Sequence, residues 1–154
     1  MKEFDQLMTL ADRLMGPDGC PWDREQTWQS LKKYTLEEVY ELLDAIDIGD
    51  IGHIQEELGD VLYNVIFYCK IAEAEGSFTT AEVVQRLHDK LYYRHPHVFG
   101  EDKAASAEDA LASWESMKHQ ERGKQERKNI FDGLPKELPS LLYAQKILKT
   151  LASI

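Results

Sequence analysis

The clearest pattern in the chain is a pair of amphipathic segments on either side of a short turn at residues 48–50. In both segments, apolar residues recur at the spacing of one helical face. They are Leu36, Val39, Leu43 and Ile46 before the turn, and Ile54, Leu58, Val61 and Val65 after it. The pattern predicts two antiparallel helices that fold back on each other at Gly49.

Each of these predicted helices also carries two acids three residues apart, beside its apolar face. Residues three apart lie on the same side of a helix. In an antiparallel pair that bends at Gly49, positions equally distant from the bend lie level with each other. The four acids should therefore meet as two matched pairs, Glu41 with Glu57 and Glu38 with Asp60.

Four carboxylates packed on one seam repel one another, and each like-charged pair on a helix costs about a few tenths of a kcal/mol. A bound hard cation would relieve this repulsion. Oxygen ligands suit Mg²⁺, and Mn²⁺ is a second candidate. The alternative interpretation is a solvated acidic face that binds nothing. The mirror symmetry of the spacing favours a metal site made by Glu38, Glu41, Glu57 and Asp60.

The rest of the chain shows helical periodicity as well, and no segment alternates in the manner of a strand. We therefore expect an all-α fold. The expected helices cover residues 2–15, 27–47, 50–75 and 79–94, and two more open at Ser106 and Pro139. Thr27, Asp50 and a capping box at residues 79–82 are the predicted N-terminal caps.

The length of 154 residues favours a single domain. We divide it into an N-terminal helix with a Cys-Pro-Trp-Asp loop (1–26), the helices of the candidate site (27–122) and a C-terminal helix (130–154). The formal charge of −10 argues against general binding to nucleic acid or to anionic membranes. Because no segment has the pattern of a signal peptide or a membrane span, we expect a cytoplasmic protein.

Two further groups of residues could bind a polyphosphate and a base. Lys90 and Arg94 lie four residues apart on one predicted helix and could neutralise phosphates. Trp114 can stack on a base, and Lys118 can contact the base edge or a phosphate. The alternatives are an exposed helix end for the two cations and a core position for Trp114. With a carboxylate-bound metal, the whole set suits phosphoryl chemistry.

Several motifs together resemble the MazG family of nucleotide pyrophosphohydrolases. The acids match the E-E-x-x-E and E-x-x-D signature of that family. The matching stretches are EEVYE at 37–41, ELGD at 57–60, CPWDREQT at 20–27, KLYYRHPHVFG at 90–100 and DGLP at 132–135. The resemblance covers essentially the whole chain.

The resemblance implies an antiparallel helical bundle that forms dimers or higher homo-oligomers. It implies a Mg²⁺-dependent enzyme that hydrolyses (deoxy)nucleoside triphosphates between the α and β phosphates and so clears excess or aberrant nucleotides. The implied metal ligands are Glu38, Glu41, Glu57 and Asp60, and the implied nucleotide contacts are Lys90, Arg94, Trp114 and Lys118. Glu37 and Glu38 are the implied catalytic acids, with Glu37 orienting or deprotonating the attacking water.

Two departures and two rival functions accompany this expectation. Tyr93 stands where many relatives carry a second arginine. Longer members have two such domains in tandem, so the chain matches a single-domain member or one part of a longer protein. The rival functions are a narrower enzyme, such as a dCTP, dUTP or phosphoribosyl-ATP pyrophosphohydrolase, and a non-catalytic helical domain that binds nucleotide or regulates a partner.

Overall fold

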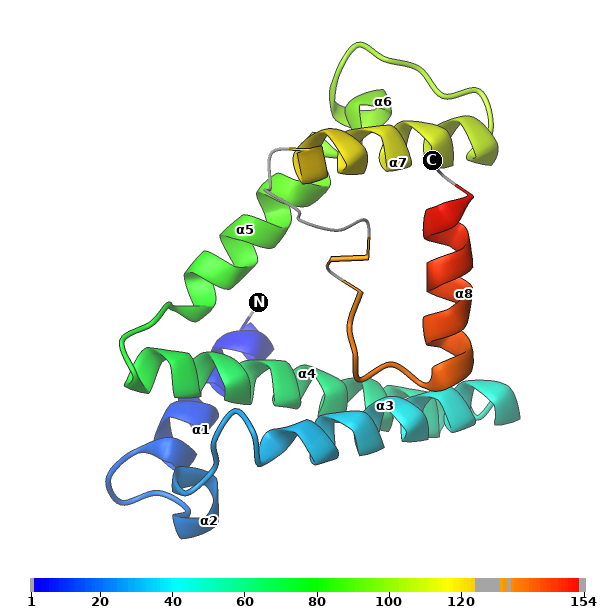
Figure 1. Ribbon diagram of the computed structural model, residues 1–154. Helices are drawn as coiled ribbons and strands as arrows, with labels where there is room; N and C mark the ends of the chain where they lie inside the picture. The colour runs from blue at the N-terminus through cyan, green and yellow to red at the C-terminus, as the bar shows by residue number, and fades with distance from the viewer. Residues whose placement is uncertain (1, 124–130, 133, 153–154) are drawn as a thin grey trace. The chain divides into compact units, whose positions relative to one another are not determined.

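The computed structural model describes residues 2–123, 131–132 and 134–152, and within these ranges every regular element is a helix (Figure 1). This confirms the predicted all-α fold class. The chain divides into two compact units on either side of the boundary between Lys90 and Leu91. The helices are α1 (Lys2–Met15), α2 (Pro21–Arg24), α3 (Leu31–Ile48), α4 (Ile51–Ala74), α5 (Thr80–Tyr93), α6 (Pro96–Phe99), α7 (Ala107–Gly123) and α8 (Ser140–Leu151).

The predicted hairpin is the centre of the first unit, where α3 and α4 run side by side in opposite directions (Figure 1). Gly49 ends α3 in the left-handed conformation, with φ of 78°, and donates its N–H to the carbonyl of Ala45. That conformation favours glycine because it has no Cβ. Asp50 then caps α4 by accepting the N–H groups of Gly52 and His53. The predicted bend and cap are both confirmed.

The core of this unit lies along the second half of α4. Leu31, Phe67 and Ile71 form a buried cluster, and partly buried aromatic residues pack against it. Trp22 of the Cys-Pro-Trp-Asp segment contacts the rings of Tyr34 and Phe67, with centroids 5.5 and 6.5 Å away. The segment forms the single turn α2, with proline at its first position, where the sequence predicted a loop.

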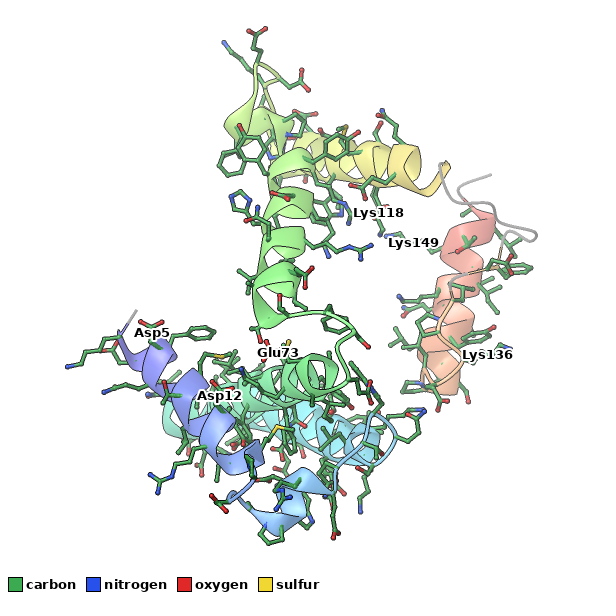
Figure 2. The ribbon with its side chains drawn as sticks, turned by 90° about the vertical axis from the view of Figure 1, so that its left-hand side faces the viewer. Asp5, Asp12, Glu73, Lys118, Lys136 and Lys149 are labelled. Carbon is green, nitrogen blue, oxygen red and sulfur yellow. The ribbon has the colours of Figure 1, made fainter. Side chains whose placement is uncertain are left out.

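Ion pairs and hydrogen bonds join α1, α4 and α5 at the far end of the hairpin. Lys70 on α4 lies 2.7 Å from Asp12 of α1 and 2.8 Å from Glu73. Figure 2 shows Asp12 and Glu73 on these two helices. The other oxygen of Glu73 accepts the backbone N–H and the hydroxyl of Thr80, both at 2.7 Å. Glu73 therefore stabilises the start of α5 as well as binding Lys70.

Two predicted features of the hairpin differ from the structure. Helix α3 begins at Leu31 instead of directly after Thr27, because Thr27 and Ser30 exchange hydrogen bonds in a preceding turn. The apolar face predicted from periodicity is largely exposed, since α1 and α2 cover a different part of α4. Leu36 is 55%, Ile46 51%, and Leu58 53% exposed. In this chain, that face is not core.

The second unit contains α6, α7 and α8. The predicted cap of α7 is confirmed, because Asp109 donates its N–H to the hydroxyl of Ser106 at 3.1 Å. Of the predicted C-terminal segment 130–154, residues 130, 133, 153 and 154 lie outside the described residues. No helix in the described part of the chain has the length and apolar character needed to cross a membrane.

Candidate functional site

Three carboxylates converge on the seam between α3 and α4. One oxygen each from Glu38, Glu41 and Glu57 can be chosen so that all three lie within 4.8 Å of one another. The mirror spacing about Gly49 predicts that Glu41 and Glu57 lie level, and both belong to this group; the group does not include Asp60, the predicted partner of Glu38. Asp60 is exposed and lies outside this group of three.

Glu57 is the buried member of the group, with 5% of its surface exposed. Its Oε1 lies 2.8 Å from Nε2 of His53, one turn earlier on α4. Its Oε2 is buried and has no hydrogen-bond partner among the described residues. Burying a carboxylate oxygen costs free energy unless a hydrogen-bond donor or a cation binds it. Oε2 of Glu57 is therefore suited to act as a ligand to a cation.

The pKa of Glu38 reflects its burial and the negative charges of the acids between α3 and α4. Burial raises the pKa of its carboxyl above the ordinary value of 4.5, and the charge of Asp60 raises it further. The charges of Glu41, Glu57 and Glu37 act in the same direction. A bound cation would reverse this effect by favouring the ionised acids. An all-oxygen set with this charge fits a hard divalent cation such as Mg²⁺.

In the second unit, Arg94 and His95 lie beside Trp114. The guanidinium carbon of Arg94 lies 5.3 Å from the centroid of Trp114, and the ring of His95 lies 5.0 Å from it. Arg94 also binds Glu121 through Nε and Nη2, with Nε 3.0 Å from the carboxylate. Glu121 is therefore a partner of a candidate phosphate ligand that the sequence did not reveal.

The candidate lysines differ in their surroundings. Lys118 on α7 lies 3.6 Å from Glu115, which also lies 3.5 Å from Lys149 of α8 (Figure 2). Lys90 is exposed on α5, at the end of the first unit. Glu37 is exposed on α3, next to Glu38.

His53 is a further neighbour of the acids that the sequence analysis missed. Its spacing from Glu57 is the signal that could have found it, because residues four apart on a helix are neighbours. By contrast, His95 and His97 flank Pro96 without forming a metal-binding group with the described residues. Nδ1 of His95 lies 2.6 Å from the carbonyl of Leu91 and serves the local backbone.

Comparison with known proteins gives a consistent family likeness. Residues 26–99 match the model of the MazG nucleotide pyrophosphohydrolase domain. The chain is 43% identical over 155 residues to a nucleoside triphosphate pyrophosphohydrolase of Escherichia coli (strain K12), with 100% of this chain and 59% of that protein covered. It is 41% identical to the nucleoside triphosphate pyrophosphohydrolase/pyrophosphatase MazG of Thermotoga maritima, covering 98% of this chain and 57% of that one.

A solved structure supports the same likeness. The crystal structure of a mazG-related protein from Thermotoga maritima matches with a TM-score of 0.64 and 25% identity. The match covers 75% of this chain and 98% of the other. The chain spans less than two thirds of the length of the two curated relatives described above.

Proposed function

Because the chain belongs to the MazG nucleotide pyrophosphohydrolase family, we propose that it is a Mg²⁺-dependent hydrolase of (deoxy)nucleoside triphosphates. The reaction adds one water across the bond between the α and β phosphates. The products are a nucleoside monophosphate and pyrophosphate. The cellular role that fits this reaction is the removal of excess or aberrant nucleotides.

The observation that carries the proposal is the convergence of Glu38, Glu41 and Glu57, with one buried oxygen of Glu57 left without a partner. We assign the cation to these three acids and to Asp60, whose charge already acts on Glu38. When bound, Mg²⁺ neutralises phosphate oxygens and makes a bound water more acidic. Mn²⁺ has the same ligand preference and could take its place.

The remaining candidates act on water and on the nucleotide. Glu37 is exposed beside the acids and is assigned to orient the attacking water and accept its proton. Lys90 and Arg94 are assigned to the phosphates, for which Arg94 must exchange its bond with Glu121. Trp114 and Lys118 are assigned to the base; stacking on an indole ring discriminates weakly between bases, which supports a broad substrate range.

The exposed apolar face of the hairpin supports a homodimer. Leu43 on α3 and Val65 on α4 are each 49% exposed, and neighbouring apolar residues continue this face along both helices. Large apolar patches of this kind mark interaction surfaces. Leu43→Glu should convert a dimer into monomers, as measured by light scattering, and an unchanged mass would contradict this interface.

The experiment that tests the reaction is product analysis after incubation with each of the eight (d)NTPs, with and without Mg²⁺. We expect monophosphate and pyrophosphate, with product formation abolished by chelation. Glu57→Gln should abolish turnover, because it removes a charged ligand while keeping the shape of the side chain. Glu56→Gln, which removes the same charge from an exposed neighbouring position, is the matched control.

Each other result points to a different function. Diphosphate and orthophosphate would show that the wrong phosphate bond had been assigned. Bound nucleotide without turnover at saturating Mg²⁺ would support a regulatory nucleotide-binding domain. Strong preference for one nucleotide would support a narrower pyrophosphohydrolase, because such selectivity needs hydrogen bonds to the base.

A further inference from the structure

Glu57 has one polar contact from a side chain of its own helix, and this contact involves only one of its two oxygens. Nε2 of His53 lies 2.8 Å from Oε1 of Glu57, and the side chains are 42% and 7% exposed. Oε2 is buried and has no hydrogen-bond partner within the described part of the chain. The two oxygens of this carboxylate therefore have different surroundings, and only Oε1 is held.

The start of α4 holds His53 in place. The side chain of Asp50 accepts the backbone N–H groups of Gly52 and His53, at 3.0 and 3.2 Å. This cap fixes the backbone of His53 in the first turn. Because residues four apart on a helix are neighbours, the imidazole then lies beside the carboxylate of Glu57. The contact follows from the turn itself and does not depend on any other helix.

We propose that His53 is a positioning residue for the metal site: Nε2–H donates to Oε1 of Glu57 and leaves Oε2 available to the cation. The inference rests on the proposed metal-dependent function. A glutamate side chain has about 1.5–2 kcal/mol of rotamer entropy to lose on being fixed. Its neighbours Glu38 and Glu41 repel it. A hydrogen bond to Oε1 holds the carboxylate near these like charges before the cation arrives.

The ion pair lies where an outer partner of a metal ligand would lie. Ligating carboxylates are commonly held by a hydrogen bond to a second residue, and loss of such a partner typically weakens metal binding about 10–100-fold. An ion pair that served stability alone would not need one carboxylate oxygen to be buried without a partner. Because His53 contacts Oε1 of Glu57 while Oε2 has no partner among the described residues, we assign His53 to positioning this metal ligand.

Two substitutions separate hydrogen bonding from other effects of the imidazole. His53→Ala removes the donor, whereas His53→Gln replaces it with a side-chain amide that can donate from the same turn. Alanine and glutamine favour helix more than histidine, and the backbone bond to Asp50 is retained, so both variants should fold. His88→Ala is the matched control, because His88 also contacts a carboxylate, Asp89, at 3.0 Å on an exposed face of α5.

The first measurement is Mn²⁺ binding to the full chain without nucleotide. Binding is monitored through the electron paramagnetic resonance signal of free Mn²⁺. We expect His53→Ala to weaken binding about 10–100-fold. His53→Gln and His88→Ala should bind as the wild type does. Wild-type affinity in His53→Ala, or equal losses in His53→Ala and His53→Gln, would overturn the positioning role.

The second measurement is the Mg²⁺ dependence of hydrolysis. In His53→Ala, the Mg²⁺ concentration for half-maximal rate should rise about 10–100-fold, while kcat at saturating Mg²⁺ returns close to the wild-type value. A lower kcat with an unchanged Mg²⁺ requirement would contradict the proposal. Failure of the proposed function is a separate result, because it would appear in the wild type as absent Mg²⁺-dependent cleavage.

Discussion

Thr35 on α3 donates a hydrogen bond from Oγ1 to Oδ1 of Asn64 on α4, at 3.2 Å. The hydroxyl of Tyr68 lies 3.2 Å from the same Thr35 oxygen. Asn64 is 8% exposed, and its amide donates to the carbonyl of Asp60 at 3.1 Å. This polar contact joins the two helices next to the acids, so it sets how α3 and α4 align at the candidate site.

A double-mutant cycle should show that Thr35 and Asn64 are energetically coupled. Asn64→Ala removes the acceptor of the buried hydrogen bond from Thr35. We expect it to lower the free energy of unfolding by about 1–3 kcal/mol. Thr35→Val should cost less, because the single hydrogen of the Thr35 hydroxyl is shared between Asn64 and the carbonyl of Leu31, which lies 3.0 Å away. The double variant should lose less than the sum, by about 0.5 kcal/mol or more.

Urea denaturation measures all three variants. Thr9→Ala is the control, because Thr9 makes a comparable hydroxyl bond to the backbone on the exposed side of α1. Strict additivity of Thr35→Val and Asn64→Ala would mean that the contact does not contribute to stability.

The hairpin and its acids could be predicted because both depend on local rules. Gly49 and Asp50 follow from turn and cap chemistry, and the level pairing of Glu41 with Glu57 follows from the symmetry of a tight hairpin. Helical periodicity also predicted the bounds of α1, and the motif at residues 79–82 predicted the capping box of α5, where Thr79 and Glu82 exchange hydrogen bonds. None of these depends on how distant segments pack.

The features that the sequence did not reveal depend on packing between segments. The burial of Asn64 could not be predicted from its own helix, because it depends on the approach of Thr35 from α3. The exposure of the apolar face that includes Leu36 and Leu58 could not be predicted, because periodicity identifies an apolar face without identifying what covers it. Arg94 was expected to be available to phosphate, and its pairing with Glu121 joins residues far apart in the chain.

Glu73 should stabilise the fold at neutral pH. Although burial opposes its ionisation, hydrogen bonds from Lys70 and from the backbone and side chain of Thr80 hold the pKa of Glu73 at about 2. Because this pKa lies below the ordinary value of 4.5, the stabilisation is present above about pH 4.5 and is lost as the pH falls toward 2. Glu73→Gln should cost about 1–3 kcal/mol at neutral pH.

Urea midpoints at about pH 7, 5 and 3 test this expectation for Glu73. The difference between wild type and Glu73→Gln should be largest at the two higher values and should shrink at pH 3. Glu3→Gln removes the same charge from the exposed first turn of α1, where it is worth about a few tenths of a kcal/mol. A difference for Glu73→Gln that grew with acidification would contradict the sign of this argument.

Tyr63 should tolerate the loss of its hydroxyl. That hydroxyl is buried and has no hydrogen-bond partner among the residues that the structure describes. Burial raises the pKa of Tyr63, and the charges of Asp23 and Cys20 add to the effect. Tyr63→Phe keeps the stacking on Phe67, with ring centroids 5.7 Å apart. We therefore expect stability to be unchanged or raised by up to about 1 kcal/mol.

Tyr68→Phe is the matched comparison for Tyr63→Phe on the same helix. The hydroxyl of Tyr68 lies 3.2 Å from that of Thr35, so its loss should cost about 0.5–1.5 kcal/mol. Thermal and urea unfolding should therefore rank Tyr63→Phe above Tyr68→Phe. The reverse order would mean that the hydroxyl of Tyr63 has a stabilising partner.

Glu38 should reduce the stability of the metal-free protein at neutral pH. Burial and then the charge of Asp60 are the largest causes that raise its pKa above 4.5. The folded state then holds a proton that the unfolded chain has already released, so stability is greatest below about pH 4.5 and falls as the pH rises through the folded-state pKa. Glu38→Gln removes this charge with little change in shape. Without metal at neutral pH, it should be more stable than the wild type by about a few tenths of a kcal/mol.

The same substitution should have the opposite effect once metal is present. Mg²⁺ stabilises the folded state only as far as the folded state binds it, so the wild type should gain thermal stability from Mg²⁺ and Glu38→Gln should gain little. Glu56→Gln should respond to Mg²⁺ as the wild type does. Melting curves at neutral pH, with Mg²⁺ and with chelator, test this directly. If Glu38→Gln were less stable than the wild type without metal, the acids would not repel one another, and the main physical reason for placing a cation between α3 and α4 would be lost.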